Sequence, residues 1–434
     1  MEVDGFILVS REDACQRSIS RNSSHDSFLP EIDKSVDGLG PWLLPLNQFI
    51  HDNPELAFRE HQAHDVLTRF MRSQDGWNVV SSAYGMETAW VAKFDSGKAG
   101  PVVSFNVEMD ALDGLGHACG HNLIAMASLA AGLATAEMVR RHSLPGKVLV
   151  LGTPGEEGVG GGKIRLLEAG AYDGVDISLI SHPGILNNSP LVRTTAFARL
   201  EVEYFGRAAH AANSPWLGIN ALDALVIAYN AVSVLRQQTM ATDVIGLSIT
   251  NGGGPTNVIH PFAAGICVLR TASSSRLKEL QEKVSACFRA GADATGARVE
   301  IKVTRGYADH VPNRVLAALY TKCWNALPNV PDPPIPPTGE LTWVKASTDQ
   351  GNLSYAMPSV NASFAIPPGP QKGQPHSPDF EKASGTKLAF DRALRVGKSL
   401  AGAAVQVLAE PGLLDQIKDQ WRRDMDALKQ PLLE

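Results

Sequence analysis

The sequence lacks a long uncharged apolar run, a paired cysteine motif and a large excess of charge of either sign. Its first residues contain no basic segment, and the apolar run at residues 5–9 is too short for a signal peptide. No window approaches the length of a transmembrane helix, so we expect no membrane partner. A soluble protein of the cytoplasm is predicted.

Charge and cysteine usage narrow the class further. The net charge of −6 is modest and the basic residues are scattered, so the basic patch expected of a nucleic-acid partner is missing. The five cysteines are odd in number and widely spaced, which predicts reduced thiols inside a cell. They are Cys15, Cys119, Cys267, Cys287 and Cys323.

What the sequence does contain is enough length for two domains, since 434 residues exceed one ordinary core. Residues 1–40 are polar and without pattern, and are predicted to form an N-terminal arm. Apolar residues at helical spacing then predict two helices within 42–70, separated by a turn at Asn53 and Pro54.

The next segment alternates between strands and helices. Apolar runs at 88–94, 102–105 and 147–151 predict strands, and an alanine-rich stretch at 123–141 predicts a helix. This alternation predicts an α/β fold with a mostly parallel sheet flanked by helices, whose ligand-binding loops follow the carboxyl ends of the strands. We assign residues 41–195 and 309–434 to this catalytic domain.

Residues 196–308 have a different character. An alternating strand, a long amphipathic helix, two further strands, a helix and a last strand follow one another. The order β-α-β-β-α-β predicts an inserted ferredoxin-like α+β domain.

The candidate chemistry begins with the run His-Ala-Cys-Gly-His at residues 117–121. Thiolate and imidazole are both zinc ligands, so Cys119 and His121 are candidate metal donors between a strand and a helix. For an isolated pair of this kind, an inert buried thiol beside surface histidines is the more common explanation. The pair must therefore be judged with the residues that follow.

Further donors follow predicted strands. Glu156 and Glu157 come after the strand at 147–151, where one carboxylate can bind metal while its neighbour acts as a base. His182 follows the apolar run at 177–180, and His376 lies in a later loop. Each residue alone is weak evidence for a metal site, since a solvated acidic loop or a surface histidine is the ordinary explanation.

Together these motifs resemble the zinc peptidase family that contains aminoacylase, bacterial glutamate carboxypeptidase, auxin-conjugate hydrolases and aminobenzoyl-glutamate hydrolases. Within that family the chain looks most similar to the cytosolic dipeptidase and aminobenzoyl-glutamate hydrolase branch. The motifs lie at residues 51–56 with Glu60, 108–112, 116–121, 154–158, 206–210 and 347–349.

The resemblance implies two divalent metal ions, Zn²⁺ or otherwise Mn²⁺ or Co²⁺, and Glu156 as general acid and base. It also implies that the inserted domain is a lid and dimerisation domain in a homodimer. His210 would stabilise the oxyanion, often from the partner subunit. The implied metal ligands are Cys119, His121, Glu157, His182 and His376.

Three further roles follow from the resemblance. Asn257 and Arg270 correspond to family positions that hold the substrate carbonyl and carboxylate, although a salt bridge is an equally good explanation for Arg270. Asp110 would orient a ligand histidine. The chain departs from the family at Asn122, where many relatives have aspartate, and at Asp113, where proline is usual. The first departure is expected to alter the field at the metals.

The resulting hypothesis is hydrolysis of the amide bond of a dipeptide or N-acyl amino acid by a metal-bridging hydroxide, with Glu156 accepting its proton. Three alternatives remain open from the sequence. They are amide formation by the same site in a biosynthetic pathway, a non-catalytic metal-dependent regulator, and a thiol hydrolase in which Cys119 is the nucleophile with His117 or His121.

Overall fold

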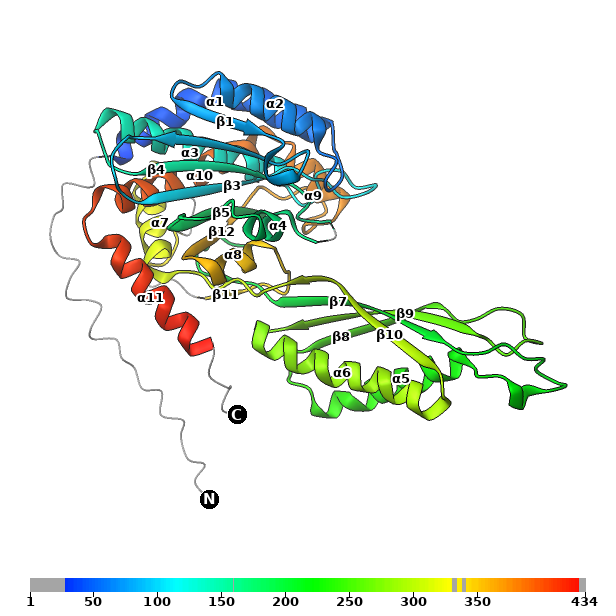
Figure 1. The fold of residues 1–434 in the computed structure, drawn as a ribbon. Helices are drawn as coiled ribbons and strands as arrows, with labels where there is room; N and C mark the ends of the chain where they lie inside the picture. The colour runs from blue at the N-terminus through cyan, green and yellow to red at the C-terminus, as the bar shows by residue number, and fades with distance from the viewer. Residues whose placement is uncertain (1–27, 159, 330–333, 338–340, 429–434) are drawn as a thin grey trace.

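The computed structural model describes residues 28–158, 160–329, 334–337 and 341–428. A six-stranded sheet with the order β1-β2-β4-β3-β5-β12 organises the first unit (Figure 1). Strands β3, β4, β5 and β12 are mutually parallel, and β1 and β2 add an antiparallel edge. The strands are β1 (Trp77–Ser81), β2 (Trp90–Asp95), β3 (Val102–Glu108), β4 (Lys147–Thr153), β5 (Ile177–Gly184) and β12 (Ser359–Ala365).

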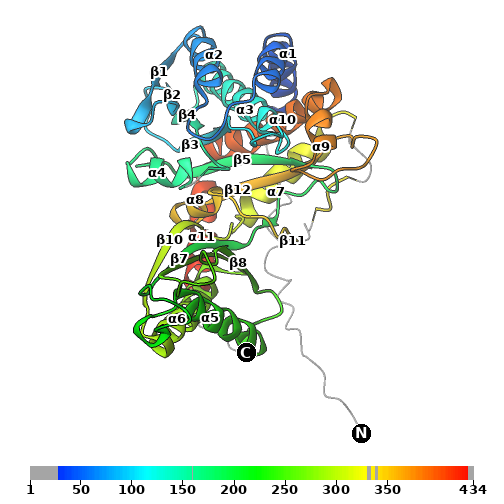
Figure 2. The same cartoon turned by 90° about the vertical axis from the view of Figure 1, so that its right-hand side faces the viewer.

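Helices cover both faces of this sheet (Figure 2). The main core lies between the sheet and the helices α1 (Leu29–Asp52), α2 (His61–Arg72), α3 (His121–Arg141), α7 (Arg314–Ala326), α10 (Lys387–Ala409) and α11 (Leu413–Leu428). A smaller core on the other face involves α4 (Gly162–Glu168) and α8 (Gln350–Ala356). The predicted α/β class and mostly parallel sheet are confirmed.

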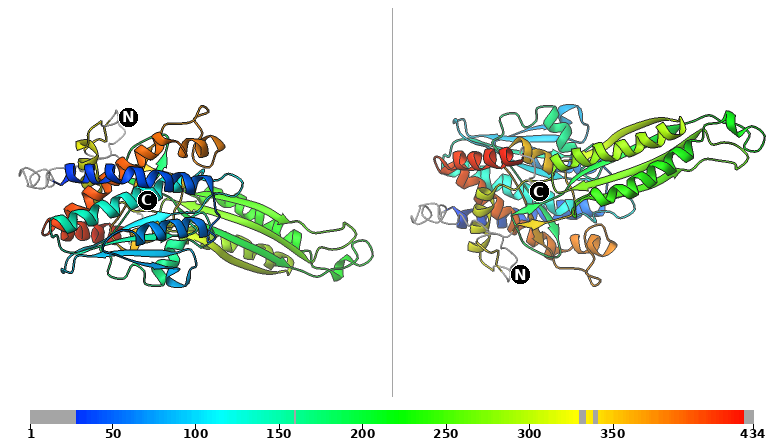
Figure 3. Two further views of the ribbon diagram at one scale, coloured as in Figure 1. Left: turned by 90° about the horizontal axis from the view of Figure 1, so that it is seen from above. Right: turned by 90° about the horizontal axis from the view of Figure 1, so that it is seen from below.

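The second unit is a four-stranded antiparallel sheet with the order β10-β7-β9-β8, on which two helices pack. Its elements are β7 (Ala196–Phe205), α5 (Ala221–Leu235), β8 (Val244–Asn251), β9 (Phe262–Thr271), α6 (Ser274–Thr295) and β10 (Arg298–Tyr307). They follow the predicted order β-α-β-β-α-β. Figure 3 shows this unit extending away from the first as an elongated arm.

Short elements connect the two units or complete the first. A parallel ribbon pairs β6 (Val192–Arg193) with β11 (Thr342–Trp343), and α9 (Pro378–Ser384) follows the loop after β12. Among the described residues, single turns of 3₁₀ helix occur at η2 (Ala83–Gly85), η3 (Pro215–Leu217) and η4 (Arg236–Gln238).

The structure corrects two expectations. Residues 29–40, assigned to the N-terminal arm, form the first half of α1, in which Ile32 and Val36 are buried; residues 1–27 lie outside the described part of the chain. The expectation that no window is long and apolar enough to cross a membrane was also wrong, because α3 passes that test with a mean hydropathy of 1.4. Its window is 94% buried in the protein, as in the core helix of a folded domain.

Helix α3 packs closely on β4 at Gly132, where an added Cβ would lie 2.3 Å from Cγ2 of Val150. We expect Gly132→Ala to lower the free energy of unfolding by about 1–3 kcal/mol, because overpacking outweighs the better helix propensity of alanine. Urea denaturation followed by circular dichroism measures the change.

Gly38 provides the matched control, since it lies within α1 and its added Cβ would meet open space. Gly38→Ala is expected to stabilise the protein by about 0.5–1 kcal/mol. If Gly132→Ala were equally stabilising, the close contact between α3 and β4 would be wrong.

Candidate metal centre and substrate cavity

The parallel strands bring residues from distant parts of the chain to one edge of the sheet. Glu108 is the last residue of β3, Glu156 and Glu157 follow β4, and His182 lies near the end of β5. His376 comes from the loop between β12 and α9. Since the carboxyl ends of parallel strands share one edge, side chains with little proximity in sequence become neighbours.

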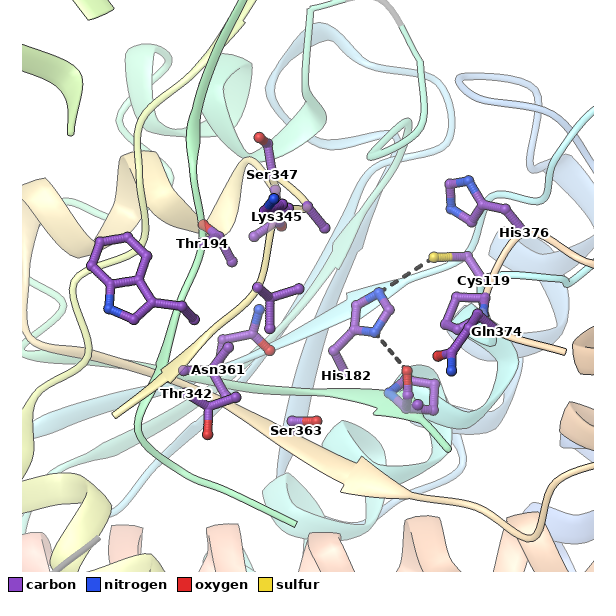
Figure 4. A pocket seen from close by; sticks show the side chains of 18 of the residues that line it. Cys119, His182, Thr194, Thr342, Lys345, Ser347, Asn361, Ser363, Gln374 and His376 are labelled. Carbon is purple, nitrogen blue, oxygen red and sulfur yellow. Dashed lines mark hydrogen bonds between the residues drawn. The ribbon is translucent and has the colours of Figure 1, made fainter. Parts of the chain in front are cut away.

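The five residues predicted as metal ligands lie together. Sγ of Cys119 is 3.3 Å from Nε2 of His182, and Nε2 of His376 is 2.9 Å from Oε1 of Glu157. His121 joins Cys119 and His182 in one group of donors, all within 4.8 Å of one another. Figure 4 shows Cys119, His182 and His376 on one side of the cavity.

The donors suit divalent metal ions. Thiolate, imidazole and carboxylate are the ligands that zinc and similar ions take in proteins. Nε2 of His121 is buried and lies 3.3 Å from Oε2 of Glu108, but neither atom makes a hydrogen bond with a described residue. Buried polar atoms without a hydrogen bond are costly unless something binds them, so the position of Nε2 fits a metal ligand.

Neighbouring groups fix the orientation of the buried imidazole of His121 and the half-buried imidazole of His182. Nδ1 of His121 lies 2.7 Å from the carbonyl oxygen of Asp110 and 3.1 Å from its Oδ1, and Nδ1 of His182 lies 2.9 Å from the carbonyl oxygen of Pro183. Oδ2 of Asp110 also accepts the backbone N–H of Glu157 at 2.8 Å. Asp110 therefore positions two of the donor residues at once.

Close packing shapes the motif around Cys119. Gly120 adopts a left-handed conformation with φ of 78°, and an added Cβ would lie 2.6 Å from Cγ of Pro183. The backbone N–H of His376 donates to the carbonyl of Ala118 at 2.8 Å, which ties the late loop to this motif. Glycine is required at position 120 for both conformation and space.

Glu156 lies in the interior beside the donors. Burial, together with the negative charges of Glu108, Glu157 and Asp349, raises the pKa of Glu156 well above its ordinary value. A carboxyl with a raised pKa is suited to accepting and returning a proton near neutral pH.

Two residues of β10 hold the backbone of this loop. The hydroxyl of Tyr307 donates to the carbonyl of Glu156 at 2.6 Å, and the guanidinium of Arg305 donates to the carbonyls of Glu156 and Glu157 at 2.9 and 3.1 Å. The second unit thus positions the catalytic candidate directly.

Glu60 holds the same loop from the other side. It accepts the backbone N–H groups of Phe58 and Gly155 at 2.9 and 2.8 Å, and the hydroxyl of Thr88 at 2.7 Å. Burial and the nearby charge of Asp110 raise the pKa of Glu60 to about 7.

The cavity beside the donors has a volume of about 590 Å³ and is bounded by both units. Arg270 lines it, with its guanidinium 4.7 Å from the centre of the Phe197 ring and one N–H donating to Oγ of Ser347 at 2.8 Å. In Figure 4, Thr194, Lys345 and Ser347 lie across the cavity from Cys119 and His376. A substrate can therefore contact the donors and a fixed cation at once.

His210 and Asn257 are not at this site in one chain. Ala196 and Phe197 begin β7 at the cavity, whereas His210 follows the far end of that ten-residue strand. At about 3.3 Å per residue, β7 separates its two ends by roughly 30 Å. Asn257 lies at the same tip, where its carbonyl accepts the N–H of Ala211 at 3.0 Å. The expected contacts with substrate are thus absent within a single chain's described residues.

Asn122, which stands where many relatives have aspartate, has a packing role. Its buried side chain donates to Oδ1 of Asn47 at 3.0 Å and to the carbonyl of Ser384 at 3.1 Å. The amide therefore links α3 to α1 and α9, which explains the departure from aspartate by packing. Asp113, the other departure, is exposed.

The position of Cys119 within two groups of metal donors favours a metal ligand over a thiol nucleophile. Burial raises the pKa of the Cys119 thiol well above its ordinary value, and the opposing effect of His121 is smaller. A catalytic cysteine needs a depressed pKa instead. His117 is buried with its ring 6.4 Å from that of His51 and belongs to none of the donor groups.

A clustered donor set at the strand ends of an α/β fold, with a buried carboxyl beside it, defines a metal-dependent hydrolase. The model of peptidase family M20/M25/M40 matches residues 102–389. The chain belongs to this family, and the resemblance inferred from its motifs is confirmed.

Comparisons with individual proteins support the same family. The chain is 37% identical over 402 residues to the Xaa-Arg dipeptidase of Mus musculus, covering 90% of each chain. It is 27% identical over 448 residues to one subunit of the p-aminobenzoyl-glutamate hydrolase of Escherichia coli, covering 87% of this chain and 91% of the relative. The crystal structure of Bacillus subtilis YXEP, a dinuclear metal binding peptidase of the same family, superposes with a TM-score of 0.63 at 18% identity, covering 86% and 99% of the two chains.

We expect Asn122→Asp to destabilise the protein by about 3 kcal/mol, since a buried carboxylate cannot donate to the Ser384 carbonyl. Chemical denaturation measures the loss, and Asn78→Asp, at an exposed position of β1, serves as the control. A variant of unchanged stability but altered metal affinity would show instead that residue 122 acts on the metals.

Proposed function

We propose that the protein hydrolyses the amide bond of a dipeptide or N-acyl amino acid with two bound divalent metal ions, Zn²⁺ in the first place and Mn²⁺ or Co²⁺ otherwise. The observation that carries the proposal is that a buried carboxyl, Glu156, lines the same cavity as a donor set for metals and the cation of Arg270. The names of the relatives support the substrate class, because a dipeptidase and an aminobenzoyl-glutamate hydrolase both cleave an amide bond to an amino acid.

Each residue has a defined task in this reaction. Cys119, His121, Glu157, His182 and His376 would hold the metals. The metals supply a lowered pKa for water and polarise the scissile carbonyl. Glu156 takes the proton of the attacking water on its carboxylate and returns it to the leaving amine nitrogen. Arg270 binds the substrate carboxylate with its planar guanidinium, while Arg305 and Tyr307 keep the Glu156 loop in place.

We further propose a homodimer in which the second unit is both lid and dimerisation domain. Strand β8 is an edge strand without a charged residue, and such an edge readily pairs with another strand. Helix α5 beside it exposes Val226, Ile227, Tyr229 and Val234. Pairing through this face would let the tip of one chain bring His210 and Asn257 to the cavity of its partner, where they stabilise the oxyanion and hold the carbonyl.

An intracellular location completes the proposal. Within the part of the chain that the structure describes, Cys119, Cys267 and Cys287 form no disulfide, which fits a reducing compartment. Cys15 lies outside the described residues.

Glu156→Gln is expected to lower kcat on the order of a hundredfold or more, because the amide cannot carry the proton. The assay is mass spectrometry of a panel of dipeptides and N-acyl amino acids with enzyme loaded with zinc or manganese. Metal content should stay at the wild-type value, and Glu87→Gln on the surface should behave as wild type. Near-normal turnover of Glu156→Gln at full metal content would contradict the role of this residue.

A mixing experiment tests whether His210 acts across subunits. Glu156→Gln and His210→Ala are each expected to be nearly inactive. Heterodimers contain one site with an intact Glu156 and a wild-type His210 from the partner, so random reassociation should restore about a quarter of wild-type activity. If mixing restores none, although native mass spectrometry shows heterodimers, His210 does not act in the partner's site.

A further inference from the structure

A group of three buried carboxylates lies beside the metal donors. Glu108, Glu156 and Asp349 are all buried, and each offers a carboxylate oxygen within 4.8 Å of the other two. Several buried acids in one place repel one another and require a compensating cation. Oxygen-rich groups of this kind are what hard divalent cations bind.

The compensating cation is the ammonium group of Lys163. Nζ of Lys163 lies 2.6 Å from Oε1 of Glu108 and 2.6 Å from Oδ1 of Asp349, and the Lys163 side chain is fully buried. The backbone N–H of Lys163 also donates to Oδ2 of Asp349 at 2.9 Å. The ammonium is thus held by the first turn of α4, by the end of β3 and by the residue before α8.

The ammonium keeps its charge in this setting. Burial alone would lower the pKa of Lys163, but Asp349, Glu108 and Glu156 together raise it well above its ordinary value. Glu108 connects this ion group to the metal donors, since its Oε2 lies 3.3 Å from Nε2 of His121. Lys163 therefore neutralises carboxylates that border the donor set on the inner side.

We propose that Lys163 is a positioning residue that occupies a built-in third cation site and so prevents Glu156 from becoming a ligand of an additional metal ion. The proposal rests on the proposed function, because it matters only if Glu156 must remain free to carry a proton. With the ammonium in place, Oε1 of Glu108 and both oxygens of Asp349 have donors without a metal, and the Glu156 carboxyl stays available to the reaction.

The test replaces Lys163 by methionine, which keeps the length of the side chain and removes its charge. After equilibration with excess Mn²⁺ and desalting, Lys163→Met should retain one more ion per chain than wild type, counted by plasma mass spectrometry. Its kcat should fall on the order of a hundredfold, the effect of a displaced catalytic group, while KM stays within a few-fold of wild type.

Two variants make the interpretation specific. Lys398→Met is the matched control, because Lys398 also bridges two acids, Asp33 and Asp37, away from the site; it should change neither metal count nor kcat. In Lys163→Met/Asp349→Asn a ligand of the extra site is missing, so the metal count should return to that of wild type. This double variant removes one charge of each sign and therefore preserves the buried charge balance if Lys163→Met alone does not fold.

The possible outcomes separate the proposal for Lys163 from the proposed hydrolase function. A folded Lys163→Met with wild-type metal count and kcat but lower thermal stability would overturn it, since Lys163 would then be a structural ion-pair partner only. The same holds if kcat of the double variant stays as low as that of Lys163→Met although its metal count is that of wild type. The metal count needs no substrate, so a wild-type enzyme inactive on the whole panel would contradict the proposed function while leaving the count decisive for Lys163.

Discussion

Negative charge buried at the carboxyl edge of the central sheet is the constraint on which the rest of the structure depends. Glu108, Asp110, Glu156 and Asp349 lie in the interior at this edge. Carboxylates leave water only when cations or hydrogen-bond donors meet them. Two helices supply such partners: α4 provides Lys163 to Glu108 and Asp349, and the start of α3 provides His121 to Asp110. Strand β10 holds the backbone of the Glu156 loop through Arg305 and Tyr307.

The same constraint explains why the two units belong to one site. The sheet end that faces the cavity places Phe197, Arg270 and Tyr307 on three adjacent strands in register. Tyr307 acts on the Glu156 backbone, whereas Arg270 stands free of the metal donors and faces the cavity. One end of the four-stranded sheet therefore contributes both to the position of the Glu156 loop and to the cavity wall that faces the substrate.

Much of this arrangement could be predicted from the sequence, because strand ends and motif residues are local signals. The parallel sheet, the β-α-β-β-α-β order and the cluster of Cys119, His121, Glu157, His182 and His376 were predicted from periodicity, motifs and resemblance. Strand β12 was missed, although it carries the site's last loop. Lys163 was missed because a single lysine after glycines looks like any surface lysine, and only tertiary structure shows that it is buried.

The apolar helix α3 has a consequence for the synthesis of the chain. In the folded protein it packs against α1, which is synthesised earlier, and against α10, which follows about 250 residues after it in the chain. At a synthesis rate of about 5–20 residues per second, that covering helix emerges roughly 12–50 s later. During this interval the ribosome presents a stretch apolar enough to pass for a membrane segment, so the nascent chain depends on α1, and on whatever else shields apolar surface in the cell, until its last helices arrive.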